Sequence, residues 1–398
     1  HPAIKTSELE LNKDSIRLDY GENCLSSPAQ LHASIVESYL RQNISVSETN
    51  AEQSIANFAA SRFGLENVKS NSIALGNGVA PIFAAILETI ADCNEKIIMP
   101  SGAYGHFVAA CNFFNTEHVF AKTSDRDRFK ITPQQLDDTL SLSGAHWLYL
   151  NAPIVNPTGA LYSNGELSDL MDVLQQHKCG LILDTIFSGL EFNKKHSQIR
   201  LDKFLTSDEG KTVPFVIMGG VSKELAAGGF RFGWAISSSE SLLNNIRNRQ
   251  GSQPHSTARY AARKIYQALS EPSHPIHQTL DNQRDILKDR SSRLVSLLEG
   301  MGWEVVPPEG GLFVCASPKK YLEQLQKSNG SQGSLNLTLA ADKIADQIFT
   351  STGLLLNNAT WTGLPSHIRF VVSIDEADFE RALGKLRDFD ANWQCHTQ

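Results

Sequence analysis

Short, continuous apolar runs recur through the middle of the chain and alternate with stretches of helical periodicity. Most of these runs end at glycine, asparagine, aspartate or proline. Continuous apolar runs are typical of parallel strands whose two faces are both buried, whereas half-exposed strands alternate apolar and polar residues. The runs lie at 72–75, 96–99, 118–120, 147–150, 180–183 and 215–218. The pattern predicts an α/β fold with a mostly parallel central sheet sandwiched by helices.

The two ends of the chain follow a different pattern, with fewer strands and longer helices. Apolar residues at helical spacing predict helices at about 29–41, 50–62, 80–91 and 376–388, and a long helical region at about 237–300. Further strand-like runs lie at 16–20, 303–306, 312–315 and 367–372. Residues 326–336 are rich in Gln, Lys, Ser, Asn and Gly and predict a surface loop.

These patterns suggest three segments. We expect an N-terminal arm at 1–45 that belongs to a smaller α+β domain, a large domain at 46–285, and the rest of the small domain at 286–398. A chain of 398 residues is long enough for two such domains with a sizeable core.

Composition narrows the classes of function. With 41% hydrophobic and 20% charged residues and a net charge of −7, the chain is ordinary for a globular protein and carries no basic field for nucleic acid or anionic membranes. No apolar stretch approaches the ~18 residues of a membrane span.

The six scattered cysteines predict reduced thiols and a cytoplasmic location. No metal-ligand spacing occurs among the histidines, so we expect no metal. The chain opens at His1 rather than Met, which suggests a piece of a longer polypeptide.

Lys223 is the candidate for covalent chemistry. A lone lysine is usually a solvated surface charge. Here glycines and Arg231 follow it within eight residues. The amine suits a Schiff base to an aldehyde cofactor, and the guanidinium suits that cofactor's phosphate.

Other polar residues also follow predicted strands, where open α/β sheets bind their ligands. Asn156 lies in an Asn-Pro-Thr-Gly segment after one strand, and Asp184 ends the next. A Gly-Asn-Gly segment, 76–78, opens a predicted helix, whose N-terminus favours a phosphate. Taken singly, these features are ordinary turn and helix-cap chemistry. Their order along the chain makes a chance combination unlikely.

This order and spacing resemble the pyridoxal-phosphate enzymes of fold type I, the class I/II aminotransferases, over nearly the whole chain. The resemblance implies pyridoxal 5′-phosphate as cofactor, an amino acid as substrate, a homodimer, and Lys223 as the catalytic Schiff-base lysine. It implies that Asp184 meets the pyridine nitrogen, Asn156 the 3-oxygen and Arg231 the phosphate. The cofactor-binding residues that it implies are Gly76, Asn77, Gly78, Val79, Tyr104, Asn156, Asp184, Phe187, Ser222, Lys223 and Arg231. Gly21, Asn156 and Arg369 are implied to bind the substrate, with Arg369 on its α-carboxylate.

The sequence departs from the family pattern at three places. Phe187 and Gly220 stand where the family usually has hydroxyl side chains, and 45–51 lacks a tyrosine that many members carry. These departures argue against ordinary dicarboxylate transamination.

Longer segments resemble the C-terminal aminotransferase-like region of methionine S-methyltransferases. They lie at 156–164, 188–192, 254–262 and 357–365. This resemblance implies a fragment of a longer chain that also carries a methyltransferase domain. It suggests methionine or an S-methylmethionine-like sulfonium as substrate, with Trp361, Phe187 and Glu22 as candidate contacts for a cation.

Three functions remain open at this point. The first is an aminotransferase that works through the Lys223 Schiff base. The second is a γ-elimination or γ-replacement enzyme acting on a sulfonium amino acid. The third is a non-catalytic aminotransferase-like domain of a methionine S-methyltransferase, against which the retained Lys223, Asp184, Asn156 and Arg231 argue.

Overall fold

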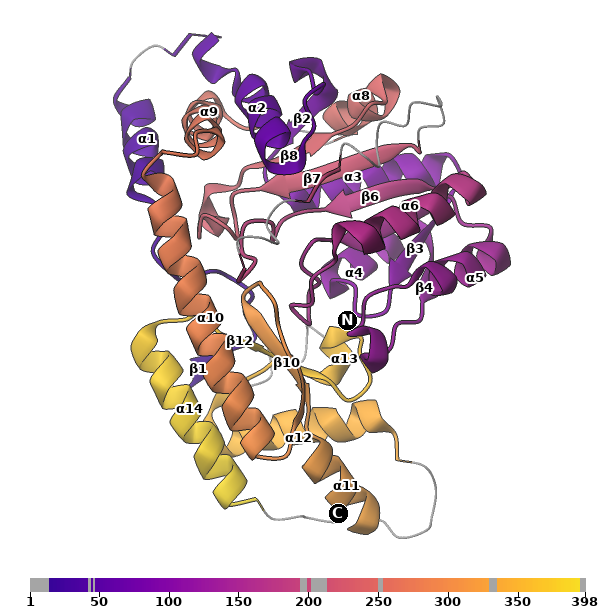
Figure 1. Ribbon diagram of the computed structural model, residues 1–398, viewed down its shortest axis with the longest axis vertical. Helices are drawn as coiled ribbons and strands as arrows, with labels where there is room; N and C mark the ends of the chain where they lie inside the picture. The colour runs from indigo at the N-terminus through magenta and orange to yellow at the C-terminus, as the bar shows by residue number, and fades with distance from the viewer. Residues whose placement is uncertain are drawn as a thin grey trace.

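The computed structural model of the protein has two lobes, which Figure 1 shows one above the other. It describes residues 14–41, 44–45, 47–193, 199–201, 213–249, 253–328 and 335–393. Cys395 and residues 329–334 of the predicted loop lie outside these ranges.

The large lobe is built on a seven-stranded sheet. In spatial order its strands are β2 (Ile73–Gly76), β8 (Gly233–Ile236), β7 (Phe215–Gly220), β6 (Gly180–Asp184), β5 (Trp147–Asn151), β3 (Lys96–Pro100) and β4 (Glu117–Ala121). Among these strands, β8 alone runs in the direction opposite to the other six, because it pairs antiparallel with both β2 and β7. The predicted mostly parallel sheet is therefore confirmed, and β8 is the strand that the sequence pattern did not reveal.

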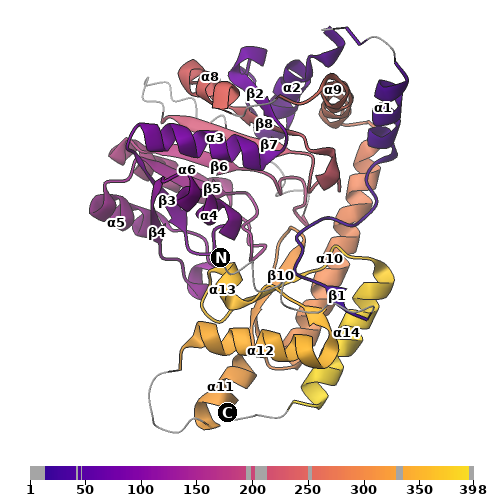
Figure 2. The same cartoon turned by 180° about the vertical axis from the view of Figure 1, so that it is seen from behind.

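Helices cover both faces of this sheet, which explains why its central strands are apolar throughout. On β6, Leu181 and Leu183 point into one core and Ile182 into the other. The first core is completed by α2 (Ala51–Phe63), α5 (Pro133–Ser143), α6 (Asn164–His177) and α9 (Ser256–Ser270). The second is completed by α3 (Val79–Asp92), α4 (Gly105–Phe113) and α8 (Glu240–Arg249). Figure 1 shows α5 and α6 on the near face, and Figure 2 shows α3 crossing the opposite face.

The small lobe combines two short sheets with helices. Its strands are β12 (Ile368–Val371), β10 (Phe313–Ser317) and β9 (Glu304–Val306), which are antiparallel, and the parallel pair β1 (Ile16–Arg17) and β11 (Leu354–Leu355). Its helices are α11 (Lys319–Ser328), α12 (Leu337–Thr352), α13 (Ala359–Thr362) and α14 (Glu376–Ala391). The start of the N-terminal arm thus lies in the small lobe, while α1 (Ala29–Leu40) packs against α9 of the large lobe.

One helix joins the two lobes. The predicted helical region at 237–300 is three helices, α8, α9 and α10 (Ile276–Gly300). Ile276 and Leu280 of α10 pack in the core of the large lobe, whereas Leu287 and Leu294 pack in that of the small lobe. The predicted domain boundaries remain predictions.

Two sequence expectations need correction. The predicted strand at 16–20 is shorter in the structure: β1 covers Ile16 and Arg17, and backbone hydrogen bonds to Leu355 and Val371 continue only through Leu18. The chain then enters the space between the lobes. Residues 326–328 of the predicted loop belong to α11.

None of the described helices is both long and apolar enough to cross a membrane.

Candidate functional site

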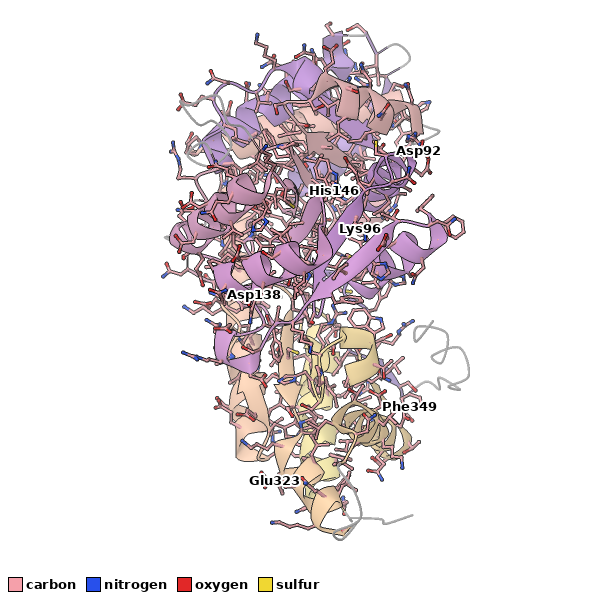
Figure 3. The ribbon with its side chains drawn as sticks, turned by 90° about the vertical axis from the view of Figure 1, so that its right-hand side faces the viewer. Asp92, Lys96, Asp138, His146, Glu323 and Phe349 are labelled. Carbon is pink, nitrogen blue, oxygen red and sulfur yellow. The ribbon has the colours of Figure 1, made fainter. Side chains whose placement is uncertain are left out.

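A cleft of about 1140 Å³ lies between the lobes. The carboxyl ends of β5 and β6 and the turn after β7 line it from the large lobe, and α12 and α13 line it from the small lobe. In Figure 3, Phe349 of α12 is labelled in the lower lobe, below Lys96 and His146 in the upper one. The predicted site residues that line the cleft are Gly21, Val79, Tyr104, Asn156, Asp184, Phe187, Ser222, Lys223, Arg231 and Arg369.

Lys223 lies in the turn that follows β7 and is half-buried. Its Nζ donates a hydrogen bond of 2.7 Å to the carbonyl oxygen of Gly21 in the N-terminal arm. Burial lowers the pKa of Lys223, and the nearby Arg369 and Arg231 lower it further, although Glu22 and Asp184 oppose them. A lysine with a lowered pKa supplies more of the neutral amine that acts as base or nucleophile.

The turn that carries Lys223 is held from two sides. Asn23 donates from its side chain to the carbonyl oxygen of Lys223, at 2.8 Å. Glu224, the next residue, forms a buried ion pair of 2.7 Å with Arg62 of α2. These contacts fix the backbone from which the lysine reaches into the cleft.

Asp184 ends β6 and is buried. Its Oδ1 accepts a hydrogen bond of 3.0 Å from the backbone N–H of Ile186, and its Oδ2 accepts one of 2.9 Å from the hydroxyl of Tyr149. Burial raises the pKa of Asp184 to about 6, against the effect of these two donors and of Lys223. A buried carboxylate of this kind gains from a cationic partner such as a protonated ring nitrogen.

The start of α3 and Arg231 form a cradle at the rim of the cleft. Gly78 precedes α3 with φ +102°, and a Cβ added there would lie 2.8 Å from Nη2 of Arg231. The guanidinium donates to the carbonyl oxygens of Gly228, at 3.1 Å, and Asn77, at 3.3 Å. Among the described residues it has no ion pair with a carboxylate. Gly76, Asn77 and Gly78 do not line the cleft themselves, but a helix N-terminus beside a guanidinium that has no carboxylate partner among the described residues fits a phosphate.

Arg369 lies on β12 and is 2% exposed. Oδ1 of Asn357 accepts from Nε and Nη2 at 3.0 and 2.6 Å, and Oδ1 of Asn156 accepts from Nη1 at 2.8 Å. Nη2 also donates to the carbonyl oxygen of Asp19, at 3.1 Å. The guanidinium carbon lies 4.2 Å from the ring centroid of Trp361. Burial lowers the pKa of Arg369 to about 10. Among the described residues its hydrogen bonds go to neutral amide and carbonyl oxygens and it has no ion pair with a carboxylate, so its charge can pair with an anion in the cleft.

Three residues of the site were not singled out from the sequence. Asn151 donates to the carbonyl oxygen of Asp184 at 3.0 Å and accepts from the backbone N–H of Asn156 at 3.0 Å, which ties the Asn156 loop to β6. Tyr149 and Asn357 hold Asp184 and Arg369. Tyr149 and Asn151 lie at the end of a predicted strand, and that position is the signal that could have identified them.

Aromatic rings form the walls of the cleft. Phe187 packs edge-to-face against Phe313 with ring centroids 5.2 Å apart, and Tyr104 lies 6.3 Å from Trp361. One predicted cation contact, Trp361, is thus engaged by Arg369, whereas Glu22 lines the cleft. In the part of the chain that the structure describes, no three His, Cys, Asp or Glu side chains are grouped to hold a metal ion.

Comparison with known proteins gives one family and several relatives. The model of the family "Aminotransferase class I and II" matches residues 16–386. Methionine S-methyltransferase of Zea mays is 32% identical over 94% of this chain, which spans only about a third (34%) of that relative's length. Aspartate aminotransferase of Bacillus subtilis is 26% identical over 79% of each chain. The crystal structure of aspartate aminotransferase from Rhizobium meliloti superposes with a TM-score of 0.79 at 19% identity, covering 98% of this chain and 94% of that one.

Proposed function

Because this chain belongs to the aminotransferase class I and II family, we propose that it moves the amino group of an amino acid held between Arg369 and Lys223. Membership confirms the resemblance expected from the sequence: the cofactor is pyridoxal 5′-phosphate, and the chain is a pyridoxal-phosphate-dependent transferase. One observation carries the proposal. A lysine of lowered pKa and a buried guanidinium, with no carboxylate in ion-pair contact among the described residues, face the same cleft.

The residues around Lys223 fit this cofactor. Gly78, the start of α3 and Arg231 would hold its phosphate, and Asp184 would hold a proton at its pyridine nitrogen. When bound, the cofactor supplies an electron sink for the pair left behind when a bond to the substrate's Cα breaks.

Lys223 would move the proton at Cα. Its amine must be neutral to accept that proton, and burial beside Arg369 and Arg231 favours the neutral form. The 2.7 Å contact from Nζ to the carbonyl oxygen of Gly21 holds the amine at the arm side of the cleft.

Arg369 would bind and orient the substrate through its α-carboxylate. Asn156 and Asn357 fix the guanidinium plane, because each accepts from it through a side-chain oxygen. The family resemblance also assigns the cofactor's 3-oxygen to Asn156, which lines the cleft. The side-chain amide of Asn156 would therefore align the substrate with the cofactor. The rings of Tyr104, Trp361 and Phe187 would exclude water from the reacting atoms.

For the substrate, we propose methionine or a sulfonium derivative rather than a dicarboxylate. Besides Arg231 and Arg369, one further arginine lines the described part of the cleft, Arg17. It is paired with Asp19 at 2.8 Å, and a second substrate carboxylate would have to displace that partner. Glu22 lines the cleft and would favour a neutral or cationic side chain. The 32% identity to a methionine S-methyltransferase points the same way.

Spectroscopy and product analysis test the proposal together. The protein is loaded with pyridoxal 5′-phosphate, and absorbance spectra are recorded while methionine, S-methylmethionine and aspartate are titrated in. Formation of a 2-oxo acid with the aminated cofactor supports transamination. Release of dimethyl sulfide identifies elimination instead. A protein whose spectrum matches that of Lys223→Ala under every condition is a non-catalytic domain.

We also propose that the protein works as a homodimer, as expected from its family. Three apolar side chains of α1 support this, since Val36, Tyr39 and Leu40 are 57%, 75% and 79% exposed. Sedimentation that shows a stable and active monomer rules the dimer out.

A further inference from the structure

Tyr149 is a buried tyrosine on the floor of the cleft. It belongs to β5 and is 1% exposed, yet it reaches the cleft surface. Its ring packs edge-to-face against Phe83 of α3 and Phe107 of α4, with centroid separations of 5.5 and 5.6 Å. Two helices and a central strand therefore hold the ring in one orientation.

The hydroxyl of Tyr149 points toward the carboxylate of Asp184. It donates to Oδ2 of Asp184 at 2.9 Å, while the other carboxylate oxygen takes the backbone N–H of Ile186 at 3.0 Å. Burial raises the pKa of Tyr149 well above its usual value, and the charge of Asp184 raises it further. The hydroxyl therefore keeps its proton, and it acts as the donor of this pair.

The two hydrogen bonds fix the plane of the Asp184 carboxylate from opposite ends. Each oxygen retains lone pairs beyond its one donor, and these can face the cleft. A neutral carboxyl in the same place would present a proton of its own and would repel a protonated ring nitrogen. The donor from Tyr149 favours the ionised form, because a hydrogen bond to a charged acceptor is stronger than one to a neutral acceptor.

We propose that Tyr149 is a positioning residue that keeps the Asp184 carboxylate ionised and aimed at the cleft, and that it thereby sets the proton on the cofactor's ring nitrogen. This inference rests on the proposed function, because it takes Asp184 as the partner of that nitrogen. It adds a residue whose role is exerted through Asp184.

The test removes only the hydroxyl. Tyr149→Phe keeps the ring between Phe83 and Phe107 and is expected to weaken binding of pyridoxal 5′-phosphate about tenfold, as loss of one hydrogen bond to a charged group does. Binding is measured by equilibrium dialysis. Tyr162→Phe is the matched control, because Tyr162 is also buried and its hydroxyl accepts from the backbone N–H of Ile131 at 2.7 Å, outside the cleft. The control is expected to bind the cofactor within about twofold of the wild type.

A double-mutant cycle separates positioning from packing. If Tyr149 acts through Asp184, Tyr149→Phe costs about tenfold in the wild-type background and less than about twofold in an Asp184→Asn background. Equal losses in both backgrounds mean that Tyr149 only supports the fold, and they overturn the proposal. Wild-type affinity in Tyr149→Phe overturns it as well.

A readout without cofactor keeps this test distinct from that of the proposed function. In the cofactor-free protein, Tyr149→Phe is expected to raise the pH at which Asp184 titrates by about one pH unit. This change is measured from the pH dependence of the unfolding free energy. An unmoved titration overturns the proposal. If the wild type binds no pyridoxal 5′-phosphate, the proposed function fails and this inference fails with it. If the wild type binds and Tyr149→Phe matches it, only the role of Tyr149 fails.

Discussion

Replacing Asp184 with asparagine is expected to stabilise the cofactor-free protein at neutral pH while removing the partner of the ring nitrogen. Burial moves the pKa of this carboxyl from 3.8 to about 6. Between these values the native state binds more protons than the unfolded state, so stability falls as the pH rises from about 4 to about 6. Two pKa units correspond to about 3 kcal/mol of unfolding free energy. Asparagine carries no such charge and avoids this loss.

The assay is urea unfolding of both cofactor-free proteins at several values between about pH 4 and pH 8. The stability of Asp184→Asn relative to the wild type is expected to grow by about 3 kcal/mol between pH 4 and pH 7 and to stay constant above that. Asp138→Asn, at an exposed position on α5, is the control and is expected to change stability by less than about 0.5 kcal/mol at any pH. A difference between the wild type and Asp184→Asn that does not vary with pH would refute the reasoning.

Three further predictions concern the other groups of the cleft. Arg369→Lys loses the planar fork and is expected to lower kcat/KM for amino acids about tenfold to hundredfold in steady-state assays, with the absorbance of the bound cofactor unchanged. Gly78→Ala strains a residue at φ +102° and drives a Cβ to 2.8 Å from Arg231, so dialysis is expected to show about tenfold weaker cofactor binding. The lowered pKa of Lys223 means that the unfolded state binds the extra proton, so the stability of the wild type relative to Lys223→Met is expected to rise as the pH approaches 10.5, measured by urea unfolding.

The sequence was sufficient to predict the residues that follow buried parallel strands. Asp184 ends an apolar run, and Asn156 and Lys223 follow such runs, so the ends of the strands could be placed without coordinates. Parallel strands bring their carboxyl ends to one edge of the sheet, and the structure indeed has all three residues lining one cleft.

The remaining parts of the site depend on contacts that periodicity does not encode. β8 is short and follows a glycine-rich turn, so its antiparallel insertion between β2 and β7 leaves no alternating pattern to detect. Asn357 meets Arg369 because a bridge between their backbones brings the two together across the end of β12. The position of Tyr149 near the end of a strand makes it a candidate for the site, but only the 2.9 Å contact to Asp184 identifies its partner.

Helix α10 also has a consequence for how the protein unfolds. At 25 residues it is about 37 Å long, and it contributes Leu280 to one core and Leu287 to the other. Neither lobe can lose its packing without fraying a helix on which the other depends. We therefore expect unfolding to be a single cooperative transition. We also expect that a chain cut within α10 yields two fragments, each of which exposes apolar residues that are buried in the intact protein.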